Sequence, residues 1–172
     1  MEGGQQVRER VIAIVFFFLG RGFAACARLD SRVRREVGTW PEGTTVTLRV
    51  APSGPQTSWS VAGGRFRHLG SRAVEPTLLV TFKNPEGALP VFLGMKGVLQ
   101  AFAEHRASLA GDVSLGMSLV RCLHIVEGYL FPAVMTRRIL PSPAHREKPM
   151  IAAYALTIFT SSAPVFVQGG AA

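Results

Sequence analysis

Hydrophobic and polar residues alternate most clearly in the stretch Thr45–Ala51. Val46, Leu48 and Val50 fall on one side of this stretch, and two threonines and an arginine fall on the other. A period of two places every second side chain on the same face of an extended chain. The pattern predicts a β-strand with one buried face.

Three further stretches complete a predicted sheet. Gln56–Ala62 and Arg65–Leu69 flank the pair Gly63 and Gly64, a two-residue signal that is typical of a tight hairpin. Thr77–Phe82 is more continuously apolar, which predicts a strand inside the sheet that is covered on both faces.

The chain before the sheet has the composition of a helix. We expect a helix over Val7–Val37, with a kink where Gly20 and Gly22 lower helix propensity. Its apolar run, Val11–Leu19, is interrupted by Arg21 and is too short to span a bilayer. The run therefore predicts a helix that faces the protein core rather than a signal peptide.

Short helices are predicted after the sheet. Asn84, Pro85 and Glu86 form a typical helix start, since Asn caps free N–H groups, Pro suits the first turn and Glu suits the positive end. Glycines then divide the segment, which predicts separate helices at Leu89–Leu93 and Val98–His105.

A short apolar stretch, Ala107–Ala110, predicts a returning strand that ends at a corner made by Gly111 and Asp112. Asp112 is suited to cap a following helix, which we expect from Ser114 to about Phe131. Apolar residues cover more than one stripe of that helix. Its excess apolar surface predicts a dry compartment between the helix and the sheet.

The composition agrees with a need to cover apolar surface. Apolar residues make up 48% of the 172-residue chain and charged residues only 17%, against about 25% in typical soluble domains. The net charge of +8 favours peripheral contact with an anionic membrane surface. The arginines are dispersed along the chain, so no nucleic-acid partner is expected.

Together, the alternating strand, the glycine hairpin, the apolar strand, the small helices and the segment Leu109–Asp112 resemble the sterol carrier protein domain family over Arg34–Phe131. The resemblance implies an α+β fold in which helices pack on a five-stranded, mostly antiparallel sheet. It also implies a hydrophobic tunnel between the sheet and the helices.

The domain organisation follows from the same reading. Residues 1–131 are expected to form the domain with its N-terminal helix, and residues 132–172 an extension that packs on it. Within the extension, a polar linker at Pro141–Pro149 precedes an apolar run from Met150 that predicts a helix ending near Ser161. This extension could fill the tunnel or act as its lid.

The leading hypothesis is therefore non-enzymatic binding or transfer of a fatty acyl, sterol-like or isoprenoid lipid. Each buried CH₂ group of such a ligand contributes about 0.8 kcal/mol. The alternative is an accessory protein-interaction module of a lipid or quinone pathway, with the cavity filled by the protein's own side chains. The residues expected to line the lipid site are Phe82, Phe92, Val98, Phe102, Leu109, Leu115, Met117, Leu119 and Leu123.

No catalytic residues, metal site or cofactor are expected. Cys122, His124 and Glu127 lie close in sequence, but Cys122 and His124 are two residues apart and so point to different faces of a helix. Cys26 and Cys122 both fall in helical segments and predict no disulfide framework, which suits a cytoplasmic protein. A homodimer is compatible with the sequence.

Overall fold

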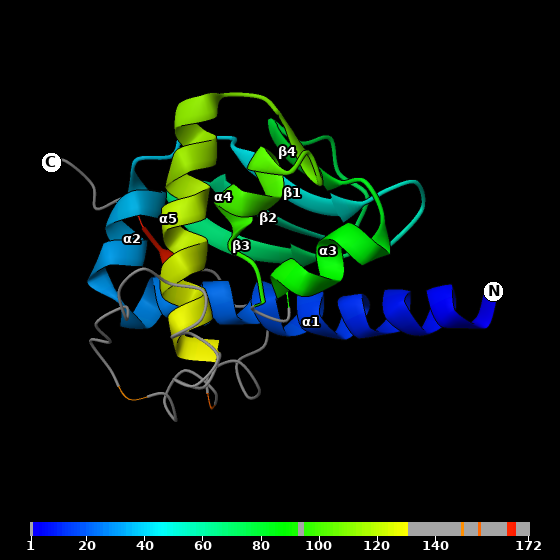
Figure 1. Cartoon of the computed structure of the whole chain (residues 1–172). Helices are drawn as coiled ribbons and strands as arrows, with labels where there is room; N and C mark the ends of the chain where they lie inside the picture. Colours follow the sequence, from blue (N-terminus) through cyan, green and yellow to red (C-terminus); the bar gives the residue numbers. More distant parts are fainter. Residues whose placement is uncertain (1, 93–94, 131–148, 150–154, 156–164, 168–172) are drawn as a thin grey trace, which may run out of the picture.

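The computed structural model describes residues 2–92, 95–130, 149, 155 and 165–167, and it shows an α+β fold (Figure 1). In chain order the elements are α1 (Glu2–Leu29), α2 (Ser31–Gly38), β1 (Thr45–Val50), β2 (Gln56–Ala62), β3 (Arg65–Gly70), β4 (Leu78–Phe82), α3 (Pro85–Phe92), α4 (Val98–Ala103), β5 (Ala107–Ala110), α5 (Val113–Leu130) and β6 (Val165–Phe166).

The strands form one mixed sheet in the order β5-β4-β1-β2-β3-β6. All neighbours are antiparallel except β1 and β4, which run parallel. In the middle of the sheet Leu48 lies opposite Thr57 on one side and Val80 on the other. The sequence predicted five strands, and the structure adds β6 at the edge beside β3.

The sheet has one apolar face and one polar face. Val46 and Leu48 of β1 and Trp59 of β2 are buried on the apolar face, as their alternation predicts. On the opposite face, the Oγ1 atom of Thr47 and the Oγ atom of Ser58 share a hydrogen bond of 2.8 Å. The helices cover the apolar face.

The expectation that Thr77–Phe82 is covered on both faces was wrong. β4 does lie inside the sheet, between β5 and β1. Its burial alternates, however, and Leu79 and Thr81 on the polar face are only half-buried. An apolar Leu79 on the polar face of the sheet made this strand look doubly covered in sequence.

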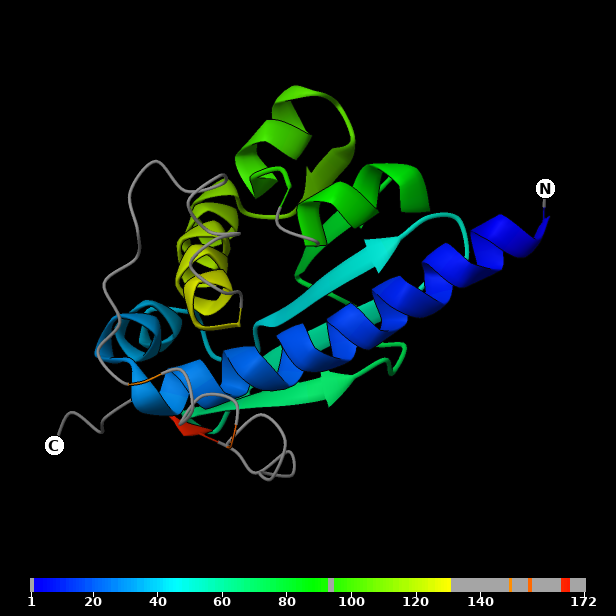
Figure 2. The same ribbon diagram turned by 60° about the horizontal axis from the view of Figure 1, so that its bottom comes forward.

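Helix α1 crosses the apolar face of the sheet, and α2 and α5 gather around its C-terminal half (Figure 2). The predicted weak point at Gly20 and Gly22 does not end the helix, and α1 continues through both glycines. They instead permit close packing: a Cβ on Gly20 would overlap the His68 ring, and one on Gly22 would press on Leu130. Trp59 Nε1 also donates a hydrogen bond of 3.1 Å to the carbonyl of Gly20.

The break between α1 and α2 falls at Asp30. Its carboxylate accepts a hydrogen bond of 2.9 Å from the backbone N–H of Arg32, so it caps the start of α2. Tyr129 of α5 donates a hydrogen bond of 3.0 Å to the same carboxylate. Burial alone would raise the pKa of Asp30, but the hydrogen bonds from Arg32 and Tyr129 outweigh it and lower the pKa.

A second polar link joins α2 to α5. Arg121 donates two hydrogen bonds, of 2.8 and 2.9 Å, to the carboxylate of Glu36. Ser118 donates to the same carboxylate at 2.8 Å and accepts from Trp40 Nε1 at 2.9 Å. These bonds, with the one from Tyr129, fix the position of α5 on α2.

The corners of the fold follow the turn chemistry of the sequence. Gly63 and Gly64 have φ angles of 60° and 64°, which suit a two-residue hairpin. The Asn84 side chain accepts a hydrogen bond of 2.7 Å from the N–H of Gly87 and caps α3. Asp112 accepts one of 2.7 Å from the N–H of Leu115 and caps α5. These predicted caps are confirmed.

Gly111 is required at the corner between β5 and α5. Its φ angle is 122°, and a Cβ there would overlap the carbonyl oxygen of Thr77. This close approach brings the start of α5 directly over the end of the sheet. The helix therefore covers the apolar face with no polar loop between them.

Among the described residues, two helices are long and apolar enough to cross a bilayer, namely Gln6–Leu29 of α1 and the whole of α5. At least half of each is buried within the fold, as is usual for core helices. The predicted linker at Pro141–Pro149 and helix from Met150 to Ser161 lie outside the described residues, apart from the single positions 149 and 155.

Candidate functional site

A small hollow lies between the apolar face of the sheet and the helices that cover it. Its volume is about 10 Å³, roughly the space of one water molecule. All helices except α2 contribute to its walls, as do β1, β4 and β5. The hollow is lined by Leu19, Leu48, Val80, Phe82, Phe92, Val98, Phe102, Leu109, Gly116, Leu119, Val120, Leu123 and Glu127.

Most of the residues that the sequence predicted for a lipid site meet in this hollow. They are Phe82, Phe92, Val98, Phe102, Leu109, Leu119 and Leu123. Leu115 packs against the core without lining the hollow, and Met117 is 43% exposed on the outer side of α5. Leu19, Leu48, Val80, Gly116 and Val120 join the lining.

The hollow is nearly closed because neighbouring side chains occupy it. A Cβ on Gly116 would overlap Cδ1 of Leu109, so the leucine side chain fills the notch that the glycine leaves. Phe82 and Phe92 pack with ring centroids 4.9 Å apart. In its present conformation the hollow is therefore too small for a lipid chain, and a chain could enter only if side chains moved.

Among the described residues of this lining, only Glu127 has an ionisable side chain. It is 6% exposed, and burial raises the pKa of its carboxyl to about 8. It lies on the α5 stripe of Gly116, Val120 and Leu123, spaced three or four residues apart. That spacing was visible in the sequence, where Glu127 was considered only as a catalytic partner of His124.

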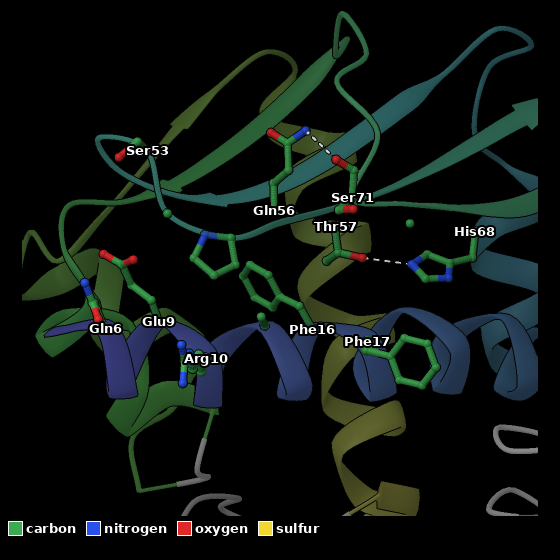
Figure 3. Close-up of a pocket in the computed structure, with 14 residues that line it drawn as sticks. Gln6, Glu9, Arg10, Phe16, Phe17, Ser53, Gln56, Thr57, His68 and Ser71 are labelled. Carbon is green, nitrogen blue, oxygen red and sulfur yellow. Dashed lines mark hydrogen bonds between the residues drawn. The ribbon is translucent and has the colours of Figure 1, made fainter. Parts of the chain in front are cut away.

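A much larger groove lies outside, between the N-terminal half of α1 and the neighbouring parts of β2 and β3 (Figure 3). Its volume is about 660 Å³, within the range of ligand pockets. Ala13, Phe16 and Phe17 of α1 supply apolar lining, and Gln56 and Ser71 supply polar lining. The sequence analysis did not predict this groove, because its residues come from segments that meet only in the fold.

His68 and Thr57 lie at one end of the groove. His68 Nε2 and Thr57 Oγ1 share a hydrogen bond of 2.9 Å (Figure 3). Burial, together with the nearby positive charge of Arg21, lowers the pKa of His68 to about 4. The imidazole is therefore neutral at pH 7 and contributes hydrogen bonding rather than charge.

Phe16 separates the groove from the inner hollow. It lines the groove, and its ring packs edge-on against Phe92, with centroids 4.7 Å apart. Phe92 in turn lines the hollow and packs against Phe82. Two aromatic rings thus form the wall between an open groove and a closed apolar interior.

The residues considered for catalysis do not form a reactive site. Cys122 is buried, and burial raises the pKa of its thiol well above the usual range, with a further contribution from Glu36. Cys26 is buried and its pKa is shifted in the same direction. Partial burial lowers the pKa of His124. Neither thiol is therefore available as a thiolate nucleophile.

No protein-family model matches the chain, and no curated protein matches it. Three chains of solved structures are similar to it, among them the following two. One is UbiJ-SCP2, a ubiquinone synthesis protein, with 15% identity and a TM-score of 0.40, covering 71% of this chain and 96% of the other. The second is a conserved hypothetical protein from Thermus thermophilus, with 18% identity and a TM-score of 0.42, covering 72% of this chain and 90% of the other.

The Thermus protein is described as a suggested sterol carrier protein. At these identities and TM-scores, neither similarity assigns a ligand or an activity to this chain.

Proposed function

We propose that this protein binds or transfers a hydrophobic ligand without catalysing a reaction, and that the ligand is a fatty acyl, sterol-like or isoprenoid lipid. The observation that carries the proposal is the arrangement of groove, aromatic wall and apolar hollow around Phe16 and Phe92. The groove offers space, and the hollow offers a dry interior that the ligand chain enters when the two rings move.

Energetics favour such a ligand. The walls of the hollow are apolar except at Glu127, so a chain that enters it loses contact with water and gains about 0.8 kcal/mol per CH₂ group. Moving a buried ring costs part of that gain, because its edge-on contact contributes about 0.5–1.5 kcal/mol. A chain of several CH₂ groups outweighs this cost.

Native mass spectrometry of the full chain tests the proposal. We expect a co-purified lipid, or uptake of an added long-chain probe. Ala13→Trp places a large side chain in the groove and should reduce uptake. Ala62→Trp, at an exposed position at the end of β2, is the matched control and should leave uptake unchanged. Failure to retain or take up any lipid would contradict the proposal.

The alternative function is an accessory protein-interaction module of a lipid or quinone pathway. The small volume of the hollow favours it, since Leu109 occupies the notch at Gly116 and the rings of Phe82 and Phe92 pack on each other. For this function, lipid uptake should be absent in the wild type and also after groove substitutions. The same mass spectrometry experiment therefore separates the two functions.

A carrier must also meet a membrane, and we propose that α1 makes this contact with an anionic surface. Val7, Ile14, Phe17 and Phe18 are exposed by 59, 58, 50 and 42%, although all four are apolar. Arg10 is exposed on the same helix. An apolar stripe beside basic residues is typical of helices that lie in a membrane interface.

A further inference from the structure

Among the described residues that line the inner hollow, Glu127 alone carries an ionisable group, and it is almost fully buried. Within the part of the chain that the structure describes, no hydrogen bond or ion pair is formed by this carboxyl. The other lining side chains are aliphatic or aromatic, and Gly116 has none. Glu127 therefore faces an apolar space without a protein partner among the described residues.

Burying the carboxyl of Glu127 without a hydrogen bond lowers the stability of the fold. A buried polar group without a hydrogen bond costs about 1–3 kcal/mol in proteins, and a buried charge costs more. By contrast, the other buried carboxylate, Asp30, accepts hydrogen bonds from Arg32 and Tyr129. Among the described residues, the contrast leaves the carboxyl of Glu127 available to a molecule that enters the hollow.

The protonation state of Glu127 restricts the chemistry of that molecule. Burial raises the pKa of the carboxyl to about 8, so it is mostly neutral at pH 7 and can both donate and accept a hydrogen bond. A hydroxyl group matches both capacities. A fatty carboxylate would bring an unpaired negative charge into the apolar site, and an amine would require both groups to be buried as ions.

We propose that Glu127 binds the hydroxyl group of an uncharged long-chain alcohol, whose hydrocarbon chain occupies the hollow between sheet and helices. This inference rests on the proposed function, because it requires a ligand in the hollow. It adds a polar recognition point to a site that is otherwise purely apolar.

Gly116 and Glu127 lie on one stripe of α5, about three helical turns apart, so a long chain laid along this stripe would extend from one to the other. Leu109 fills the notch above Gly116, on the same helical stripe as Glu127. Rotation of Leu109 away from Gly116 frees space next to α5. Phe102, beside it in the lining, is only half-buried and can turn outward. The hollow can therefore widen without displacement of the backbone of α5.

The test compares probes that share one hydrocarbon chain: 1-dodecanol, dodecyl methyl ether, dodecanoate and dodecylamine. Each is added to the full chain, and binding is measured by native mass spectrometry for the wild type, Glu127→Gln and Glu127→Leu. Glu75→Leu, which removes an exposed carboxyl, is the matched control. Leucine is a safe replacement, because removing an uncompensated buried carboxyl does not threaten folding.

We expect the wild type to bind 1-dodecanol about tenfold more tightly than the ether, which accepts but cannot donate, in line with one hydrogen bond. Glu127→Gln should keep most of this preference, since an amide also donates and accepts. Glu127→Leu should abolish it, while Glu75→Leu should retain it.

A preference for the alcohol that persists in Glu127→Leu would overturn the assignment, as would a preference of the wild type for dodecanoate or dodecylamine. Equal binding of alcohol and ether in the wild type would also overturn it, while leaving the proposed function intact. Failure of every probe to bind any of the proteins would instead reject the proposed function, and this inference with it.

Discussion

The ring of Phe16 on α1 lies edge-on against the ring of Phe92 on α3, with centroids 4.7 Å apart and an angle of 80° between the planes. The contact joins the first helix of the chain to a helix that follows the fourth strand. It also separates the groove from the inner hollow, so its strength controls access between them.

Weakening this wall should increase ligand uptake. Phe16→Leu keeps the position apolar but removes the aromatic pair, which contributes about 0.5–1.5 kcal/mol. We expect uptake of 1-dodecanol to rise by up to about tenfold, measured by native mass spectrometry. Phe66→Leu changes a buried phenylalanine that lines neither the groove nor the hollow and should leave uptake unchanged. Equal effects of both substitutions would contradict the role of Phe16.

Glu127 should make the protein less stable as the pH rises. The pKa of its carboxyl is about 8 in the folded protein, against the ordinary value of 4.5, so the folded state binds more protons between these two pH values. Stability is full below about pH 4.5 and falls up to about pH 8. We expect Glu127→Gln to gain about 3 kcal/mol relative to the wild type between about pH 5 and about pH 8.

Urea unfolding at the two pH values measures this difference. His68 acts in the opposite direction, because its lowered pKa makes the folded state lose stability as the pH falls below 6.5. That contribution is common to both proteins and cancels in the comparison. Glu75→Gln, at an exposed site, is the control. If the difference in the free energy of unfolding between the wild type and Glu127→Gln were the same at both pH values, the carboxyl would not be buried.

Gly111→Ala should destabilise the fold by about 2 kcal/mol or more. The φ angle of 122° disfavours any side chain, and the added Cβ would overlap the backbone carbonyl of Thr77, which cannot move without disturbing β4. Gly97→Ala, where nothing lies within 4 Å of the added Cβ, should cost less than about 1 kcal/mol. Thermal unfolding of both variants provides the comparison, and equal losses would contradict it.

The exposed stripe on α1 should bind anionic vesicles. Phe18→Glu removes an apolar contact and adds a negative charge, so we expect at least about tenfold weaker binding to vesicles that contain phosphatidylserine. Val113→Glu changes an equally apolar residue, 69% exposed, at the start of α5 and should have little effect beyond its charge. Similar losses in both variants would indicate binding through net charge alone.

Local sequence signals predicted the strands and corners well. The alternation around Leu48 and the cap at Asp112 depend on neighbouring residues only, and the structure confirms both. The class of the fold also followed from the order of such elements. The position of the helix break was missed, because glycine propensity pointed to Gly20 and Gly22, whereas α1 continues through both and ends at Leu29.

The candidate site was predictable only in part. Residues such as Leu119 and Leu123 could be placed on the inner face of α5 from their spacing. The open groove could not be predicted from the sequence, because it depends on how α1 lies across β2 and β3. Met117 was expected inside but is exposed, since a helix with a wide apolar face does not reveal which edge of that face is covered.

The two sides of the hollow are anchored unequally. Tyr129 and Arg121 tie α5 to α2 through Asp30 and Glu36, whereas α4 spans only Val98–Ala103 and has no side-chain cap at its first turn. Local opening therefore costs least on the α4 side. Hydrogen exchange should be faster in α4 than in α5, which forms the firmly held wall of the hollow.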